Sequence, residues 1–108
     1  MKHPTFDSNG YPTPATLRRI RRWPMDDWRN LIRFLREAWW PDFGRKGQDG
    51  KSHGFRWRGS WLRLATGGWS GNEEIVGALR QSEFWIFHWY KSVRGGLYLF
   101  ALWRKEKL

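Results

Sequence analysis

Apolar residues at helical spacing predict two helices in the N-terminal part of the chain. Thr13 followed by Pro14 is a typical helix start, because proline suits the first helical position, and this helix is expected to run to about Arg22. A second helix follows Pro24 and ends before Pro41, since the residue ahead of a proline disfavours helical geometry. This second helix has the strongest amphipathic pattern of the sequence, and its apolar stripe consists of Trp28, Leu31, Ile32, Leu35, Ala38 and Trp39.

Alternation with a period of two predicts a β-hairpin over residues 55–65. A single strand over this range would divide its apolar side chains between the two faces of a sheet, whereas a two-residue turn at Gly59 and Ser60 brings them to one face. The resulting register has four cross-strand pairs, which are Phe55 with Leu64 and Trp57 with Leu62 on the core face, and Arg56 with Arg63 and Arg58 with Trp61 on the other face.

Residues 66–79 predict a sharp corner between that hairpin and a third helix. Ser70 is followed by Glu73 at the spacing of a capping box, in which each side chain bonds to the backbone N–H of the other residue. A phosphate-binding role for the turn at Gly67 and Gly68 is disfavoured, because no lysine follows at phosphate-loop spacing and two carboxylates occupy the first helical turn.

A second hairpin is expected from residues 84–92 and 97–104, around an Arg-Gly-Gly turn at residues 94–96. One of its faces carries Trp85, Phe87, Trp89, Tyr98, Phe100 and Leu102. The reverse face is nearly as apolar and carries Phe84, Ile86, His88, Tyr90, Leu97, Leu99, Ala101 and Trp103. Three short helices do not suffice to cover both faces, so a candidate contact surface for a second copy of the chain or for another protein consists of Leu97, Leu99, Ala101 and Trp103.

These elements predict a small α+β domain in the order α-α-β-β-α-β-β, with an antiparallel sheet packed by helices. With 108 residues the chain has room for one core, which we assign to residues 13–104. Residues 1–12 are expected to form a flexible arm unless they dock, residues 43–54 a polar loop, and residues 105–108 a charged tail.

The charge of the chain indicates a binding function in addition to the predicted fold. Twenty lysines and arginines against ten carboxylates give a formal charge of +10, and such a protein is drawn to polyanions. The candidate nucleic-acid or partner-binding residues are Arg18, Arg19, Arg22, Arg29, Arg33, Arg36, Arg56, Arg58, Trp61 and Arg63. The alternative for the helical arginines is a solvated charged flank.

The pairing of Arg56 with Arg63 is unfavourable by itself, because like charges directly across two strands repel. A bound anion would explain the pair, and Arg58 stacked on Trp61 would add a cation–π platform suited to single-stranded nucleic acid. Arginines that simply splay into solvent are the alternative. The ten tryptophans of the chain serve first to fill the core of so small a domain.

Several classes of site are disfavoured by composition. Cysteine is absent and the three histidines lack ligand spacing, so neither a disulfide, a metal site nor a cofactor is expected. No apolar run is long enough for a membrane span or a secretory signal, which favours an intracellular protein. An enzyme is the least favoured class, because a catalytic site would have to be assembled from the distant residues Glu74, Glu83, His88 and Tyr90.

Four segments carry a resemblance to known proteins: RRIRRWPMDDW, WWPDFG, TGGWSGNEEIVGAL and RGGLYLF. Together they resemble a group of small, largely uncharacterised proteins encoded by bacteriophages and prophages, over roughly residues 15–100. The resemblance implies a phage accessory origin and expression in the cytoplasm of an infected bacterium, and it carries no catalytic residue. The chain departs from the group at Leu97, Leu99 and Ala101, where polar outward residues are usual.

Two functional hypotheses follow from the sequence. The first is a non-enzymatic module that binds nucleic acid or a host nucleoprotein complex through an arginine- and tryptophan-rich surface. The second is a counter-defence inhibitor of the anti-CRISPR type, which binds a host defence protein by protein–protein contact. A DNA mimic would be acidic, so an inhibitor with this charge would act on acidic protein surfaces or on bound guide RNA.

Overall fold

The computed structural model of the chain describes residues 1–39 and 54–102. Its elements, in chain order, are α1 (Pro14–Arg21), the 3-10 turn η1 (Met25–Asp27), α2 (Trp28–Ala38), β1 (Phe55–Arg58), β2 (Trp61–Ala65), α3 (Ser70–Arg80), α4 (Glu83–His88), β3 (Trp89–Val93) and β4 (Leu97–Ala101). The predicted α+β class and the order α-α-β-β-α-β-β are confirmed, with α4 as an addition. The tail at residues 105–108 and nearly all of the loop predicted over residues 43–54 lie outside the described residues.

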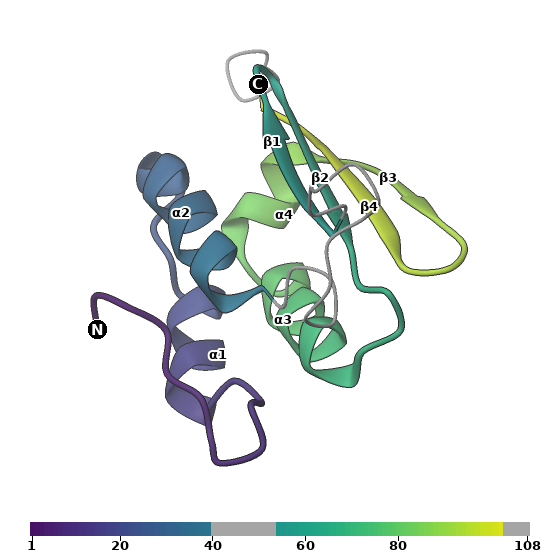
Figure 1. Cartoon of the computed structure of the whole chain (residues 1–108). Coiled ribbons are helices and arrows are strands. Elements are labelled where there is room, and N and C mark those ends of the chain that lie inside the picture. The colour runs from purple at the N-terminus through teal and green to yellow at the C-terminus, as the bar shows by residue number, and fades with distance from the viewer. Residues whose placement is uncertain (40–53, 103–108) are drawn as a thin grey trace.

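The four strands form one antiparallel sheet in the order β1-β2-β4-β3. Within the first hairpin, all four predicted cross-strand pairs are present, and Gly59 occupies the turn with a positive φ of 55°. Figure 1 shows the four α-helices gathered on one side of this sheet. The parity of the hairpin therefore correctly predicted which side chains face the helices and which face away.

The hydrophobic core lies between the sheet and the helices. From the sheet, Leu62, Leu64 and Phe100 are fully buried. The helices contribute Ile20, Leu31, Ile32, Leu35, Ile75, Leu79 and Phe84, all of them at most 1% exposed. Burial of large aliphatic and aromatic side chains of this kind stabilises a domain by roughly 1.5–3 kcal/mol for each residue.

The strand predicted over residues 84–92 is wrong in its first half, because α4 occupies Glu83–His88 and the strand β3 begins only at Trp89. Ser82 caps this helix, since its Oγ accepts a hydrogen bond of 3.4 Å from the backbone N–H of Trp85. Helical spacing keeps Phe84 and His88 together on the buried side, as a strand would also have done. It turns Ile86 into solvent instead, where that side chain is 78% exposed.

The predicted capping box at Ser70 is also wrong, although α3 does begin at that residue. Trp69 holds the capping position without a side-chain hydrogen bond to the helix, and Ser70 is the first helical residue. The Ser70 hydroxyl lies 2.6 Å from the hydroxyl of Tyr11, and Glu73 accepts a long hydrogen bond of 3.5 Å from Thr66. Tertiary partners have therefore replaced the local cap.

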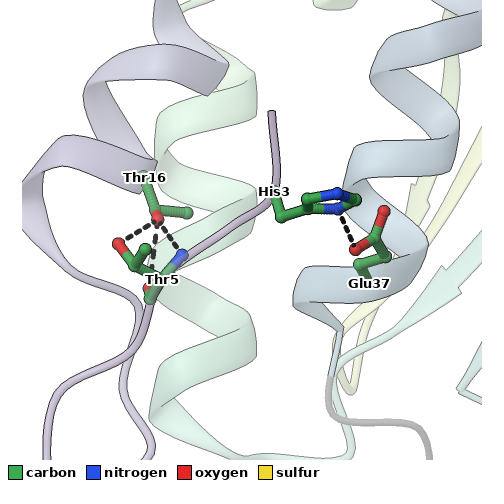
Figure 2. A network of polar contacts seen from close by, with 4 residues as sticks. All are labelled: His3, Thr5, Thr16 and Glu37. Carbon is green, nitrogen blue, oxygen red and sulfur yellow. Dashed lines mark hydrogen bonds and ion pairs between the residues drawn. The ribbon is translucent and has the colours of Figure 1, made fainter. Parts of the chain in front are cut away.

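The N-terminal segment, predicted to be flexible unless it docks, lies against the helices. Figure 2 shows two of the contacts that hold it. The buried hydroxyl of Thr16 accepts from the backbone N–H of Thr5 at 2.8 Å and donates to the carbonyl oxygen of the same residue at 3.0 Å. Nearer the terminus, Nδ1 of His3 lies 2.8 Å from a carboxylate oxygen of Glu37 on α2. The segment thus joins α1 to α2.

Candidate functional site

The face of the sheet that points away from the helices, here called the outer sheet face, carries a row of residues that crosses all four strands. Arg56 of β1 lies opposite Arg63 of β2, and Arg63 lies opposite Leu99 of β4. Leu99 in turn lies opposite Lys91 of β3. Arg56 and Lys91 are exposed, whereas Arg63 and Leu99 are half-buried. Three cations and one leucine thus form a continuous line, because Cβ atoms of opposite residues lie only about 4.5–5.5 Å apart.

Beside this row, Trp61 of β2 and Tyr90 of β3 form an aromatic pair. Their ring centroids are 5.1 Å apart and the ring planes meet at 81°, in an edge-to-face arrangement. Ala101, the β4 partner of Trp61, is fully buried beneath this face. A side chain as small as alanine lets two rings from β2 and β3 meet above the strand between them. Even so, Trp61 and Tyr90 remain 38% and 49% exposed.

Arg58 does not stack on Trp61, contrary to the prediction from their register. The two residues are paired across β1 and β2 as expected, and Arg58 is exposed. However, the cation–π contacts between described residues do not include Arg58, and the ring of Trp61 meets that of Tyr90 in an edge-to-face arrangement instead. The platform on the outer sheet face is therefore an aromatic pair with separate cations beside it.

The helical arginines occupy other parts of the molecule. Arg33 and Arg36 of α2 approach Trp57 from the helix side of the edge strand β1, with guanidinium carbons 5.8 and 5.7 Å from its ring centroid. Arg29 lies 4.4 Å from the ring of Trp28. The α1 group consists of Arg18 and Arg22, both exposed, and Arg19, which lies 3.7 Å from the ring of Trp23. The ten residues predicted as one binding set thus do not share one face, and only Arg56, Arg58, Trp61 and Arg63 lie on the outer sheet face.

The candidate protein-contact residues lie partly beneath this surface. Leu97 and Leu99 are half-buried in β4, an interior strand of the sheet, and Ala101 is fully buried. Trp103 lies outside the described residues. Val93 of the edge strand β3 pairs with Leu97 and is 38% exposed, so the outer sheet face has an apolar end as well as a cationic row.

The exposed cations Arg56, Arg58 and Lys91 form no salt bridge with a carboxylate of the described chain. Between residues in the ranges 1–39 and 54–102, the only salt-bridge contact joins His3 to Glu37, which is on the helix side. Arg56, Arg58 and Lys91 therefore have no described carboxylate within 4 Å. Exposed cations in this arrangement attract anions whose charges are spaced along a chain.

Sequence reasoning missed Lys91 on this surface. It did place Tyr90 on the face of Leu99 and Ala101, but it did not predict the contact of the Tyr90 ring with Trp61. The strand register is irregular between Trp89 and Lys91, which places an additional residue in β3. Both Tyr90 and Lys91 consequently lie on the outer sheet face, whereas strict alternation puts only one of them there. A bulge of this kind has no reliable signal in the sequence.

The residues considered for catalysis lie in different environments. His88 is fully buried, its ring centroid 4.7 Å from that of Phe84 and its Nδ1 3.0 Å from the carbonyl oxygen of Ala101. Tyr90 lies on the outer sheet face, whereas Glu74 and Glu83 are exposed on α3 and α4. Within the described residues, no group of three or more histidine, cysteine, aspartate or glutamate side chains is arranged to hold a metal ion.

A hollow of about 510 Å³ lies between η1 and α4, away from the outer sheet face. Its lining residues are Pro24, Met25, Asp26, Trp28, Glu83 and Phe87. The two carboxylates make this hollow unsuited to a phosphate group, because like charges repel. The arrangement that suits a polyanion is therefore the outer sheet face and not this hollow.

Comparisons of the chain with models of protein families, with curated proteins and with solved structures found no match. Among residues 1–39 and 54–102, no helix has the length and apolar character needed to cross a bilayer.

Proposed function

We propose that the protein is a non-enzymatic binding module that engages nucleic acid, free or in a host nucleoprotein complex, through the outer sheet face. The observation that carries the proposal is the cationic row in which Arg56 and Arg63 are direct cross-strand neighbours and Lys91 follows on the same face. Like charges placed opposite each other destabilise a sheet by about 0.2–1 kcal/mol. A phosphate chain bound along the row would offset this repulsion.

Arginine suits this role because its planar guanidinium binds two phosphate oxygens at once. Contacts to phosphates supply affinity without reading the base sequence, so we propose binding with weak sequence preference. In keeping with the resemblance of the sequence, we further propose that the protein is a phage accessory protein that acts in the cytoplasm of an infected bacterium.

Two double variants with the same change of charge test this proposal. Fluorescence anisotropy with labelled single- and double-stranded oligonucleotides should show micromolar or tighter binding that weakens as salt rises. In Arg56→Gln/Arg58→Gln, the slope of log K against log salt should decrease by roughly 1.4–1.8, because two phosphate contacts are lost. The matched control Arg18→Gln/Arg22→Gln removes two exposed charges from α1 and should leave the slope nearly unchanged. Equal losses in both variants, or no salt-sensitive binding at all, would refute the proposal.

A counter-defence inhibitor of the anti-CRISPR type is the second candidate, favoured by the apolar end of the outer sheet face. Val93 is 38% exposed there, beside the half-buried Leu97. An inhibitor that binds protein should retain a stoichiometric partner from a bacterial lysate after nuclease treatment and lose it in Val93→Glu. A nucleic-acid-binding module should lose its partners when the nuclease is added.

A further inference from the structure

We infer that the ligand of the outer sheet face is a single-stranded nucleic acid, with one or more bases stacked on Trp61 and Tyr90 and its phosphates along Arg56, Arg63 and Lys91. The inference rests on the proposed function and adds the strandedness of the ligand and the way its bases are held. Three features of the surface support it: the exposed rings, the width of the sheet and the arrangement of rings beside cations.

The aromatic pair is exposed on a surface that is otherwise rich in cations. Trp61 and Tyr90 are 38% and 49% exposed even though they touch each other. An exposed aromatic face can stack on an unpaired base of any identity. In a duplex, by contrast, the faces of the bases are already stacked on one another, and a protein reaches only their edges. The ring pair is therefore complementary to unpaired bases.

The width of the sheet also favours a single strand over a duplex as the ligand. The row from Arg56 to Lys91 spans all four strands, which is about 14 Å between the axes of β1 and β3. The major groove of duplex DNA is only about 12 Å wide and admits a helix or a two-stranded ribbon. The outer sheet face therefore cannot enter the groove as a whole, whereas a flexible single strand can lie across it.

The rings and the cations of this face are placed to contact the bases and the phosphates of one strand, respectively. The aromatic pair and the cationic row lie side by side, because Trp61 and Arg63 are two residues apart on β2 and both point to the outer sheet face. Bases can then stack on the rings while the connecting phosphates follow the cations. Four-stranded sheets that bind single strands in this way hold about two or three bases.

An alternative role of the ring pair is structural, since Trp61 and Tyr90 also cover the buried Ala101. A stacking role and a structural role differ in their dependence on the bases. We therefore use three labelled probes of about 12 units, within the usual range of site sizes. The probes are a thymidine single strand, an abasic strand with the same phosphates, and a duplex.

The chain offers a matched control for Trp61. Trp89 is exposed to nearly the same extent, 40% against 38%, but it pairs with the core residue Phe100 and stacks on Trp85, so it lies on the helix side of the sheet. Trp61→Ala should weaken binding of the thymidine strand by about 5- to 100-fold and leave the abasic strand unaffected. Trp61→Phe should restore much of the affinity, and Trp89→Ala should leave both strands unchanged.

The unmodified protein should bind the thymidine strand about tenfold or more tightly than the duplex at the same salt concentration. The inference is overturned, with the proposed function intact, by duplex binding as tight as that of the single strand, or by a Trp61→Ala variant that weakens the thymidine and abasic strands equally or neither of them. If none of the three probes binds in a salt-sensitive way, the proposed function itself is wrong. Should Trp61→Ala fail to fold, Tyr90→Leu provides the same comparison.

Discussion

At the scale of single residues, Thr66 connects the corner before α3 to the turn between β3 and β4. It is 1% exposed, and its backbone N–H donates to the carbonyl oxygen of Gly96 at 2.9 Å. Its hydroxyl accepts a hydrogen bond of 3.3 Å from the N–H of Gly68. Gly96 approaches so closely that a Cβ atom there would clash with the Thr66 hydroxyl, and its φ of 87° is one that side-chain-bearing residues rarely adopt.

Gly96→Ala and its neighbour Gly95→Ala should therefore differ in stability. Both glycines have positive φ values, 87° and 97°, but a Cβ atom at Gly95 would meet open space. Gly95→Ala should lower the free energy of unfolding by about 1–2 kcal/mol through backbone strain alone. Gly96→Ala adds the clash with Thr66, and the loss should be larger by about 1 kcal/mol or more. Urea unfolding measures both, and equal losses would show that contact with Thr66 is unimportant.

At the scale of elements, the first hairpin combines a stable core face with a repulsive outer face. Phe55 and Trp57 pack against the buried cluster, whereas Arg56 lies opposite Arg63 on the outer sheet face. Like charges directly opposite each other reduce the stability of a hairpin, and under the proposed function a bound phosphate chain offsets this cost. Stability and affinity should consequently change in opposite directions when the repulsion is removed.

Arg56→Gln should raise the free energy of unfolding by about 0.2–1 kcal/mol, because it removes the charge opposite Arg63. The same variant should weaken binding of nucleic acid. The control Arg58→Gln removes a charge that lies opposite Trp61 and should bring no comparable gain in stability. Urea unfolding at low salt is the appropriate measurement, since urea is uncharged. A less stable Arg56→Gln protein would mean that this pair is not repulsive in the free state.

At the scale of the whole molecule, the charge of +10 is large for 108 residues. In the described part of the chain, the one salt-bridge contact joins His3 to Glu37 and involves no lysine or arginine. Self-repulsion of the net positive charge destabilises the compact state and is screened by salt, because the Debye length falls from about 10 Å at 0.1 M to about 3 Å at 1 M.

Raising the sodium chloride concentration from about 0.05 to about 0.5 M should therefore raise the melting temperature by a few degrees, as screening weakens the repulsion. The same change in salt should weaken binding of nucleic acid. The control Arg18→Gln/Arg22→Gln has a lower net charge, and its melting temperature should depend less on salt. Calorimetry or circular dichroism can follow all of these transitions. A melting temperature that falls with salt would contradict net repulsion in the folded protein.

The sequence by itself determined the features that depend on near neighbours. The amphipathic stripe of α2, the Thr13 start of α1 and the register of the first hairpin all follow from residues within a few positions of one another. Side-chain parity settles such a register, because a slip by one residue would turn every apolar side chain of the strand toward solvent. Four members of the candidate site, Arg56, Arg58, Trp61 and Arg63, could accordingly be placed on one face.

Only the tertiary structure decided the features that depend on distant partners. Helical and extended geometry both bury Phe84 and His88 on one side, so packing against the core selected the helix α4. The row that adds Lys91 to the arginines requires β4 to lie between β2 and β3. Lys91 and Tyr90 share the outer sheet face because β3 is irregular between Trp89 and Lys91, and the ring of Tyr90 meets that of Trp61 across β4. Pairing between strands far apart in the chain is determined by burial of the whole core, which no local pattern contains.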